Sequence, residues 1–202
     1  MSKIKLGIYG GTFSPPHLGH VSAAYSFVDG VGLDKLLIMP NFLPPHKLED
    51  GFASAEDRLT MCRLAFSDVP KTEVSDFEIE KGGKSYTYLT LQAFSSNKTD
   101  VYFLCGTDMF LTLDSWKCPE IIFDLATICY VRRENDDKNH ELLEEKAEEY
   151  RKKFSARIIS LSHNAFEVSS TELRKNIKDE LSVEYALPEN VRDYVRERGL
   201  YR

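Results

Sequence analysis

The sequence predicts an α/β fold: a doubly wound, Rossmann-like parallel sheet with helices on both faces. Short apolar runs rich in β-branched residues recur along the chain, and segments with helical periodicity lie between them. The runs are continuously apolar rather than alternating, which is typical of strands covered on both faces. We predict strands at residues 4–9, 36–39, 101–105, 127–131 and 157–161.

Helices are predicted from apolar stripes and from the capping residues at their ends. Ser54 and Asp57 form a capping pair that opens a helix, whose apolar stripe includes Leu59. Near the end of the chain, Pro188 suits the first position of a helix and Gly199 suits its stop. Further helices are predicted at residues 18–28, 88–95 and 140–153.

The length and composition fit one globular domain. The chain has 202 residues, of which 42% are hydrophobic and 29% charged, so it is neither disordered nor fibrous. We expect a single domain over residues 1–202, with a C-terminal helical part from about residue 168 packed on it. The 26 Lys and Arg against 32 Asp and Glu give a net charge of −6. Because this charge disfavours nucleic acid as a partner, any phosphate must be bound by a local site.

The cysteines and the apolar segments bear on the compartment. Cys62, Cys105, Cys118 and Cys129 show no C-x-x-C spacing, and we expect them to be buried thiols in a reducing compartment. The N-terminal apolar stretch is too short for a secretory signal, and no run of roughly 18 apolar residues occurs. We therefore expect a soluble, cytoplasmic protein that does not enter a membrane. The sequence leaves open whether the protein forms a homo-oligomer.

A glycine pair and two histidines follow the first predicted strand, in the segment GGTFSPPHLGH. Ligands of open α/β sheets bind beyond the carboxyl ends of the strands. Gly10 and Gly11 allow a tight turn, and His17 and His20 share the first turn of the next helix, whose N-terminus favours an anion. The segment indicates phosphate binding; a metal pair or a structural histidine remains an alternative. Neither G-x-G-x-x-G nor a Walker motif is present, which disfavours a dehydrogenase or a P-loop ATPase.

A second anion-friendly helix start is predicted in the segment VSSTELR. Ser169 and Glu172 form a capping box there, and Arg174 lies one turn along. Such boxes also occur as ordinary helix caps. The interpretation of this segment as an anion site is strengthened because the chain already has one predicted anion site.

Two further segments follow predicted strands. The loop PNFLPPHK presents His46 and Lys47 at its end, although it could equally be a plain surface loop. Gly106 and Asp108 suit a ribose hydroxyl, with helix capping as the alternative. Trp116, the single tryptophan, could stack on a heteroaromatic ring or belong to the core.

Together these segments resemble the bacterial nicotinate mononucleotide adenylyltransferase family. The family motifs GGTFDPxHxGH and ISSTxxR correspond to GGTFSPPHLGH and VSSTELR, and the resemblance covers nearly the whole chain. The H-x-G-H element alone marks the wider nucleotidyltransferase superfamily. The resemblance is narrowed from this superfamily to the one family by the segment PPHK, the residues Ser-Tyr-Thr at 85–87 and the later tryptophan. One departure is Ser14, where the family usually has Asp, so we assign no charge-dependent or metal-binding role to that position.

The resemblance implies a nucleotidyltransferase-type fold and a reaction of NAD biosynthesis. ATP and nicotinate mononucleotide would give nicotinate adenine dinucleotide and pyrophosphate, with Mg²⁺ held mainly by the substrate phosphates; we assign no residue as a metal ligand. It implies catalytic roles for His17, His20 and Arg174. It implies ATP contacts by Gly10, Gly11, Thr12, Phe13, His17, His20, Gly106, Asp108, Ser169, Ser170, Thr171 and Arg174. It implies mononucleotide contacts by Lys47, Ser85, Tyr86, Thr87, Trp116 and Arg133.

The chemistry of this reaction needs little from the protein beyond positioning. The mononucleotide phosphate is already an anionic nucleophile, so neither a general base nor a covalent intermediate is required. We expect protonated histidines, Lys47 and Arg174 to offset the repulsion between the two substrates. Alternatives are another adenylyl- or cytidylyltransferase, such as one acting on phosphopantetheine, or a nucleotide sensor without catalysis. The net charge of −6 and the lack of a second, basic domain in this sequence count against a tRNA-binding synthetase fragment.

Overall fold

The centre of the protein is a six-stranded parallel sheet, seen in a computed structural model that describes residues 2–44, 51–133, 137–163 and 168–202. The strand order is β3-β2-β1-β4-β5-β6. The chain therefore builds one half of the sheet outward from β1 to β3, returns to the other side of β1, and builds the second half outward from β4 to β6. This is the strand order of a doubly wound Rossmann-type sheet, and the predicted fold class is confirmed. The strands are β1 (Ile4–Gly11), β2 (Lys35–Pro40), β3 (Thr72–Val74), β4 (Thr99–Cys105), β5 (Ala126–Arg133) and β6 (Ile158–His163).

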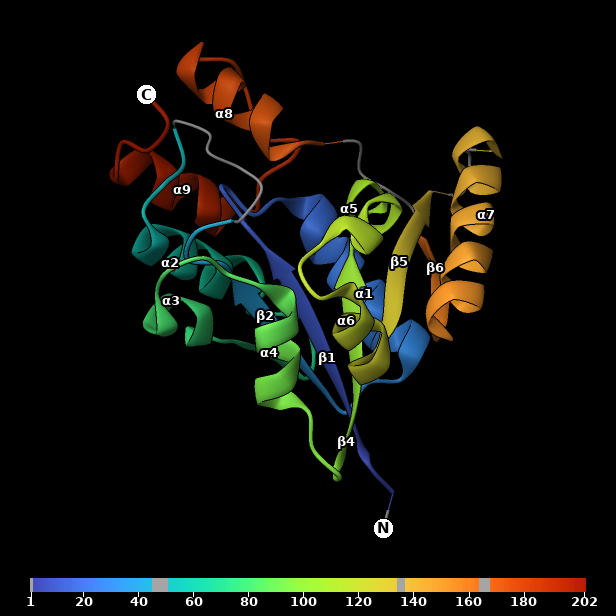
Figure 1. Cartoon of the computed structure of the whole chain (residues 1–202). Coiled ribbons are helices and arrows are strands. Elements are labelled where there is room, and N and C mark those ends of the chain that lie inside the picture. Colours follow the sequence, from blue (N-terminus) through green and yellow to red (C-terminus); the bar gives the residue numbers. More distant parts are fainter. Residues whose placement is uncertain (1, 45–50, 134–136, 164–167) are drawn as a thin grey trace.

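Helices cover both faces of the sheet, with α8 and α9 beyond the ends of the strands (Figure 1). The long helices are α1 (Leu18–Val31), α2 (Ala55–Ala65), α7 (Asp137–Phe154), α8 (Ser170–Lys178) and α9 (Glu189–Glu197). The shorter ones are α3 (Phe77–Lys81), α4 (Thr87–Phe94), α5 (Thr107–Leu111), the 3₁₀ turn η1 (Leu113–Ser115) and α6 (Pro119–Leu125).

Each face of the sheet has its own apolar core, because successive strand residues point to opposite faces. Tyr9 points to the core formed with α1, α2, α8 and α9, whereas Ile8 points to the core formed with α4, α5, α6 and α7. The segment after residue 168 contributes Leu173, Val183 and Val191 to the first core. The backbone N–H of Leu18 also donates to the carbonyl of Ala186 at 2.8 Å.

Each of the five predicted strands corresponds to an observed one, although the run at residues 157–161 begins one residue before β6, and β3 was not predicted. It is a three-residue edge strand that is half-exposed, so its sequence contains no continuous apolar run. The short helices α3, α5 and α6 were also missed, because five to seven residues hold too few turns for a stripe to appear. Pro188 is the N-cap residue of α9 rather than its first helical residue.

The cysteines are free thiols. Cys62, Cys105 and Cys129 are buried as predicted, but Cys118 is only half-buried, so the expectation was wrong for that residue. Within the described ranges, we find no helix with the length and apolarity that crossing a bilayer requires.

Candidate active site

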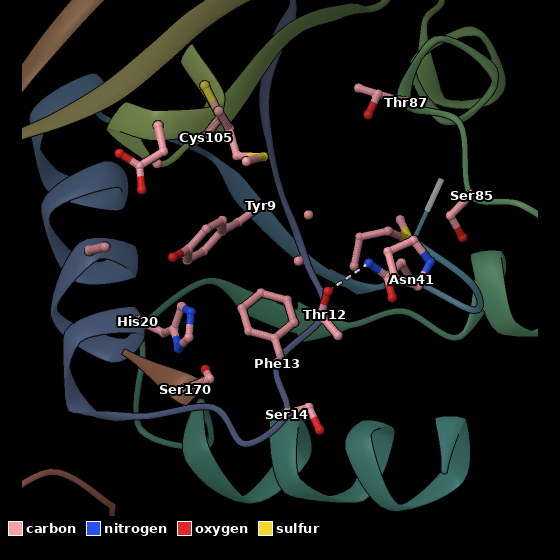
Figure 2. Close-up of a pocket in the computed structure, with 18 of the residues that line it drawn as sticks. Tyr9, Thr12, Phe13, Ser14, His20, Asn41, Ser85, Thr87, Cys105 and Ser170 are labelled. Carbon is pink, nitrogen blue, oxygen red and sulfur yellow. Dashed lines mark hydrogen bonds between the residues drawn. The ribbon is translucent and has the colours of Figure 1, made fainter. Parts of the chain in front are cut away.

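A pocket of about 510 Å³ lies where β1 and β4 end, and the two predicted anion-binding segments both line it (Figure 2). Its size is typical of small-molecule sites. The pocket brings together most of the residues predicted from the sequence. These are Gly10, Gly11, Thr12, Phe13, His17, His20, Ser85, Tyr86, Thr87, Gly106, Asp108, Trp116, Ser169, Ser170, Thr171 and Arg174.

The glycine pair does not make the turn that its sequence suggested. Gly10 and Gly11 continue β1, in register with Met39 and Pro40 of β2. The chain turns instead at Phe13, whose φ of 49° lies in the left-handed region. Gly11 is needed for space, since a Cβ there would come within 2.9 Å of the Phe13 ring. The glycines therefore let the Phe13 ring fold back over the strand end.

The two histidines hold each other through a reciprocal capping arrangement. His17 is the N-cap residue of α1, and its Nδ1 accepts from the backbone N–H of His20 at 3.3 Å. The Nδ1 of His20 accepts from the backbone N–H of His17 at 3.2 Å. The rings stack with their centroids 3.7 Å apart. Because a neutral imidazole has one donor and one acceptor nitrogen, each ring carries its proton on Nε2.

Burial keeps both rings neutral, which corrects the expectation of protonated histidines. Burial lowers the pKa of His17 to about 4. Burial, and then the proximity of His17, hold the pKa of His20 well below its ordinary value. At neutral pH the pair presents two Nε2–H donors rather than two positive charges.

The start of α8 is bonded to the loop of the first motif. Ser169 caps α8 as predicted, accepting from the N–H of Glu172 at 3.1 Å. Ser170 Oγ donates to the carbonyl of Pro15 at 2.9 Å, and an Nη of Arg174 donates to the carbonyl of Ser14 at 2.9 Å. These bonds bring segments more than 150 positions apart in sequence to one wall of the pocket.

The side chain of Ser14 is buried and forms hydrogen bonds within the protein. It is 1% exposed, and its Oγ accepts from the N–H of Ala53 at 3.1 Å and shares a hydrogen bond of 2.9 Å with Tyr201 Oη. A neutral hydroxyl at this position therefore links three separate segments of the chain.

The residues Ser-Tyr-Thr at 85–87 lie across β1 from the histidines. Figure 2 shows Ser85 and Thr87 with Asn41 on one side of Thr12, and His20 on the other. Ser85 Oγ accepts from the N–H of Phe42 at 3.0 Å. The pocket thus has two halves that meet at the end of β1.

Trp116 and Asp108 complete the walls of the pocket. Trp116 is half-buried at the end of η1, with its ring edge-on to Phe103 at a centroid distance of 6.4 Å. Asp108 is exposed in the first turn of α5, and no side chain caps that helix. The alternative that Thr107 or Asp108 serves as a helix cap was therefore wrong.

Two buried charges beside the pocket were not predicted. Arg58 is 3% exposed and donates to the carbonyls of Thr12, Phe42 and Ala53 at 2.9, 3.0 and 3.2 Å. Glu78 is 8% exposed and lines the pocket, and burial raises its pKa. Both lie on helices in charged stretches, so the sequence carried no signal that they are buried.

Comparison with known proteins identifies the family. Residues 8–176 match the Cytidylyltransferase-like family model. A probable nicotinate-nucleotide adenylyltransferase of Desulfatibacillum aliphaticivorans is 35% identical, covering 98% of this chain and 100% of its own. One from Caldicellulosiruptor saccharolyticus has the same identity and the same coverage of both chains. This chain belongs to the nicotinate-nucleotide adenylyltransferase family.

Solved structures with the same fold include adenylyltransferases from other organisms. The nicotinic acid mononucleotide adenylyltransferase of Plasmodium falciparum, complexed with NaAD, matches with a TM-score of 0.77 at 17% identity, over 98% of this chain and 97% of that one. A putative nicotinate-nucleotide adenylyltransferase of Vibrio parahaemolyticus matches with a TM-score of 0.69 at 19% identity, over 98% and 96% of the two chains. At these identities the likeness shows a shared fold.

Two residues that the family resemblance placed at the mononucleotide are not located by the structure. Lys47 lies outside the described residues, together with His46. Arg133 is the last residue of β5, and its side chain is not described. Their contacts with substrate remain predictions of the nicotinate-nucleotide adenylyltransferase resemblance.

Proposed function

We propose that this chain transfers the adenylyl group of ATP to nicotinate mononucleotide, giving nicotinate adenine dinucleotide and pyrophosphate in NAD biosynthesis. The observation that carries the proposal is the single pocket in which two helix starts converge from one side and the residues at 85–87 with Trp116 from the other. Two groups of lining residues in one pocket would give each substrate its own half. The names of the curated relatives support this assignment.

The reaction is a displacement at the α-phosphorus of ATP. An oxygen of the mononucleotide phosphate attacks that phosphorus, the bond to the bridging oxygen breaks, and the electron pair leaves with pyrophosphate. No proton has to be removed from the nucleophile. The protein must align the two phosphates and stabilise the charge that develops on the α-phosphoryl and leaving oxygens.

Among the described residues, we propose that His17 and His20 serve as neutral hydrogen-bond donors and Arg174 as the cation. A hydrogen bond from the Nε2–H of His17 or His20 to a charged phosphate oxygen contributes about 1.5–3 kcal/mol, as does a charge-assisted bond from Arg174. Alignment of the reacting phosphates contributes as much as about 7–11 kcal/mol. Positioning therefore dominates, and the mutual capping of the histidines serves it directly.

Mg²⁺ belongs to the proposal as an ion carried by substrate. Among the residues that the structure describes, no three His, Cys, Asp or Glu side chains gather closely enough to hold a metal ion. The proposal therefore places Mg²⁺ on the phosphates of ATP, where it would offset negative charge. Its partners are then the small molecules ATP and nicotinate mononucleotide; nucleic acid is not among them, and a homo-oligomer is compatible with the site.

Pyrophosphate release tests the proposed function. The full-length protein is mixed with ATP and Mg²⁺, and with nicotinate mononucleotide, nicotinamide mononucleotide or phosphopantetheine in parallel. We expect release with nicotinate mononucleotide and loss of release on chelation of Mg²⁺. Activity with phosphopantetheine alone would overturn the assignment.

A further inference from the structure

Tyr9 places a buried polar group on the wall of the pocket. It precedes the two glycines of β1, pairs in register with Leu104 of β4, and is 9% exposed. Its ring meets Phe13 edge-on with the centroids 5.4 Å apart, and it lies 6.3 Å from the ring of His20. These apolar contacts hold the ring and leave the hydroxyl to find its own partner.

The hydroxyl of Tyr9 has no hydrogen-bond partner among the residues that the structure describes. The hydroxyl is not sealed off, because among the described residues only Ser95 Oγ is a fully buried side-chain polar atom without a partner. Tyr9 lines the pocket, so a bound ligand can supply the missing partner. Burial raises the pKa of this phenol, so the group remains protonated and can donate. Phenylalanine would fill the same space, and the apolar core therefore does not require the hydroxyl.

The location of Tyr9 in the pocket indicates which of the two substrates its hydroxyl would contact. In Figure 2, Tyr9 lies between His20 and Cys105, on the opposite side of β1 from Asn41, Ser85 and Thr87. Cys105 ends β4, and the turn that follows it leads to Asp108. The proposed function places phosphates at His20 and a ribose near Asp108. Tyr9 lies between those two points, which is where the ribose joins the phosphates.

We propose that the Tyr9 hydroxyl donates a hydrogen bond to the ribose of ATP and so contributes to recognition of a ribonucleoside triphosphate. The naming of ATP rests on the proposed function. The presence of an unpartnered donor in this half of the pocket does not. Tyr9 is then a binding residue for the adenylyl donor, with no part in holding the mononucleotide.

The test compares Tyr9→Phe with a matched control. Tyr102→Phe removes a hydroxyl from the neighbouring strand β4 at a half-buried position that does not line the pocket. ATP affinity is measured by calorimetry, and KM is measured for both substrates. We expect Tyr9→Phe to weaken ATP binding about five- to tenfold, the range for one neutral hydrogen bond, with KM for the mononucleotide and the melting temperature unchanged. We expect Tyr102→Phe to match the wild type.

Analogues of ATP locate the hydrogen bond. If the bond goes to the ribose, either 2′-deoxy-ATP or 3′-deoxy-ATP will bind Tyr9→Phe as well as it binds the wild type, because the same bond is already missing. A penalty that persists with both analogues overturns the ribose assignment, and wild-type ATP affinity in Tyr9→Phe overturns the role of the hydroxyl. A wild-type protein that neither binds ATP nor releases pyrophosphate refutes the proposed function itself, which separates the two failures.

Discussion

At the scale of single residues, the histidine pair shows how backbone contacts set a side chain's chemistry. His17 and His20 each accept a backbone N–H through Nδ1, so their tautomers are set by the first turn of α1. Both Nε2–H groups are left for ligand. The site therefore obtains two oriented donors without burying two cations close together.

Replacement of His20 by Ala should lower kcat by about 100-fold or more, the usual effect of losing an oriented donor to a developing charge. The melting temperature should change little, because His17 still caps α1. Initial rates of pyrophosphate release and thermal unfolding measure the two effects. His140→Ala, on α7 away from the pocket, is the matched control and should retain wild-type turnover. Near-normal kcat in His20→Ala would remove this residue from the catalytic machinery.

His17 should make the protein less stable in acid. Its pKa falls from 6.5 in the unfolded chain to about 4 in the folded one. Between these values the unfolded chain binds a proton that the folded chain does not, so the free energy of unfolding falls as the pH falls, by up to about 3 kcal/mol from this residue. Urea unfolding from about pH 6.5 to about pH 4 measures the slope. His17→Asn keeps an N-cap acceptor that does not titrate and should flatten the curve; an unchanged slope would contradict the assignment.

Trp116 should affect one substrate more than the other. It lines the pocket with the residues at 85–87, on the side proposed for the mononucleotide. Trp116→Ala removes a flat aromatic surface, so KM for nicotinate mononucleotide should rise about tenfold while KM for ATP changes less than about twofold. Steady-state kinetics with each substrate varied in turn give both constants. Equal increases in the two would exclude Trp116 from the nicotinate half of the pocket.

At the scale of elements, α2 braces the loops around the pocket through one buried guanidinium. Arg58 bonds to carbonyls before α1, after β2 and at the start of α2 itself. Phe42 extends the contact, since its N–H donates to Ser85. The loops that carry both halves of the site thus share a single anchor.

Loss of this anchor should be costly. Arg58→Met leaves several carbonyl oxygens without a partner and should lower the free energy of unfolding by about 3 kcal/mol or more. Arg63→Met is the control on the same helix, because Arg63 is exposed and forms a surface ion pair with Asp76 at 3.6 Å. This substitution should cost less than about 1 kcal/mol. Denaturant unfolding of both variants decides the comparison, and equal losses would show that Arg58 is not an anchor.

At the scale of the whole molecule, the C-terminal segment is hydrogen-bonded to the loop of the first motif. Tyr201 Oη and Ser14 Oγ are 2.9 Å apart across 187 positions of sequence. Tyr194 donates to Asp57 at 2.8 Å, which joins α9 to α2. The site is therefore assembled from both ends of the chain.

A double-mutant cycle measures the hydrogen bond between Ser14 and Tyr201. Ser14→Ala and Tyr201→Phe should each destabilise the protein, and together by less than the sum, with a coupling of about 1 kcal/mol. Tyr185→Phe serves as the control partner, because Tyr185 is 53% exposed and bonds to Asn176 rather than to Ser14. Free energies of unfolding in urea give the coupling. Strict additivity of Ser14→Ala and Tyr201→Phe would show that the hydroxyl pair does not contribute.

Local patterns predicted much of the fold and the site. The five apolar runs all became strands, and the capping residues Ser54 and Ser169 act as predicted, because caps and strand runs depend on neighbours within a few positions. The spacing of His17 and His20 correctly placed both rings on one turn. The edge strand β3 and the short helices lacked such a pattern and were missed.

The residues alone therefore predicted the doubly wound sheet, the family and the two helix starts that line the pocket. Only the folded chain decided that the histidines are neutral, that Arg58 and Glu78 are buried, and that the Tyr9 hydroxyl lines the pocket with no partner among the described residues. The reason is physical: a motif records chemistry that acts over one helical turn, whereas burial and pKa depend on what distant segments bring to the same place. The acidic composition required only that any phosphate be bound by a local site, and the tertiary structure shows two helix starts lining one pocket where we propose that site.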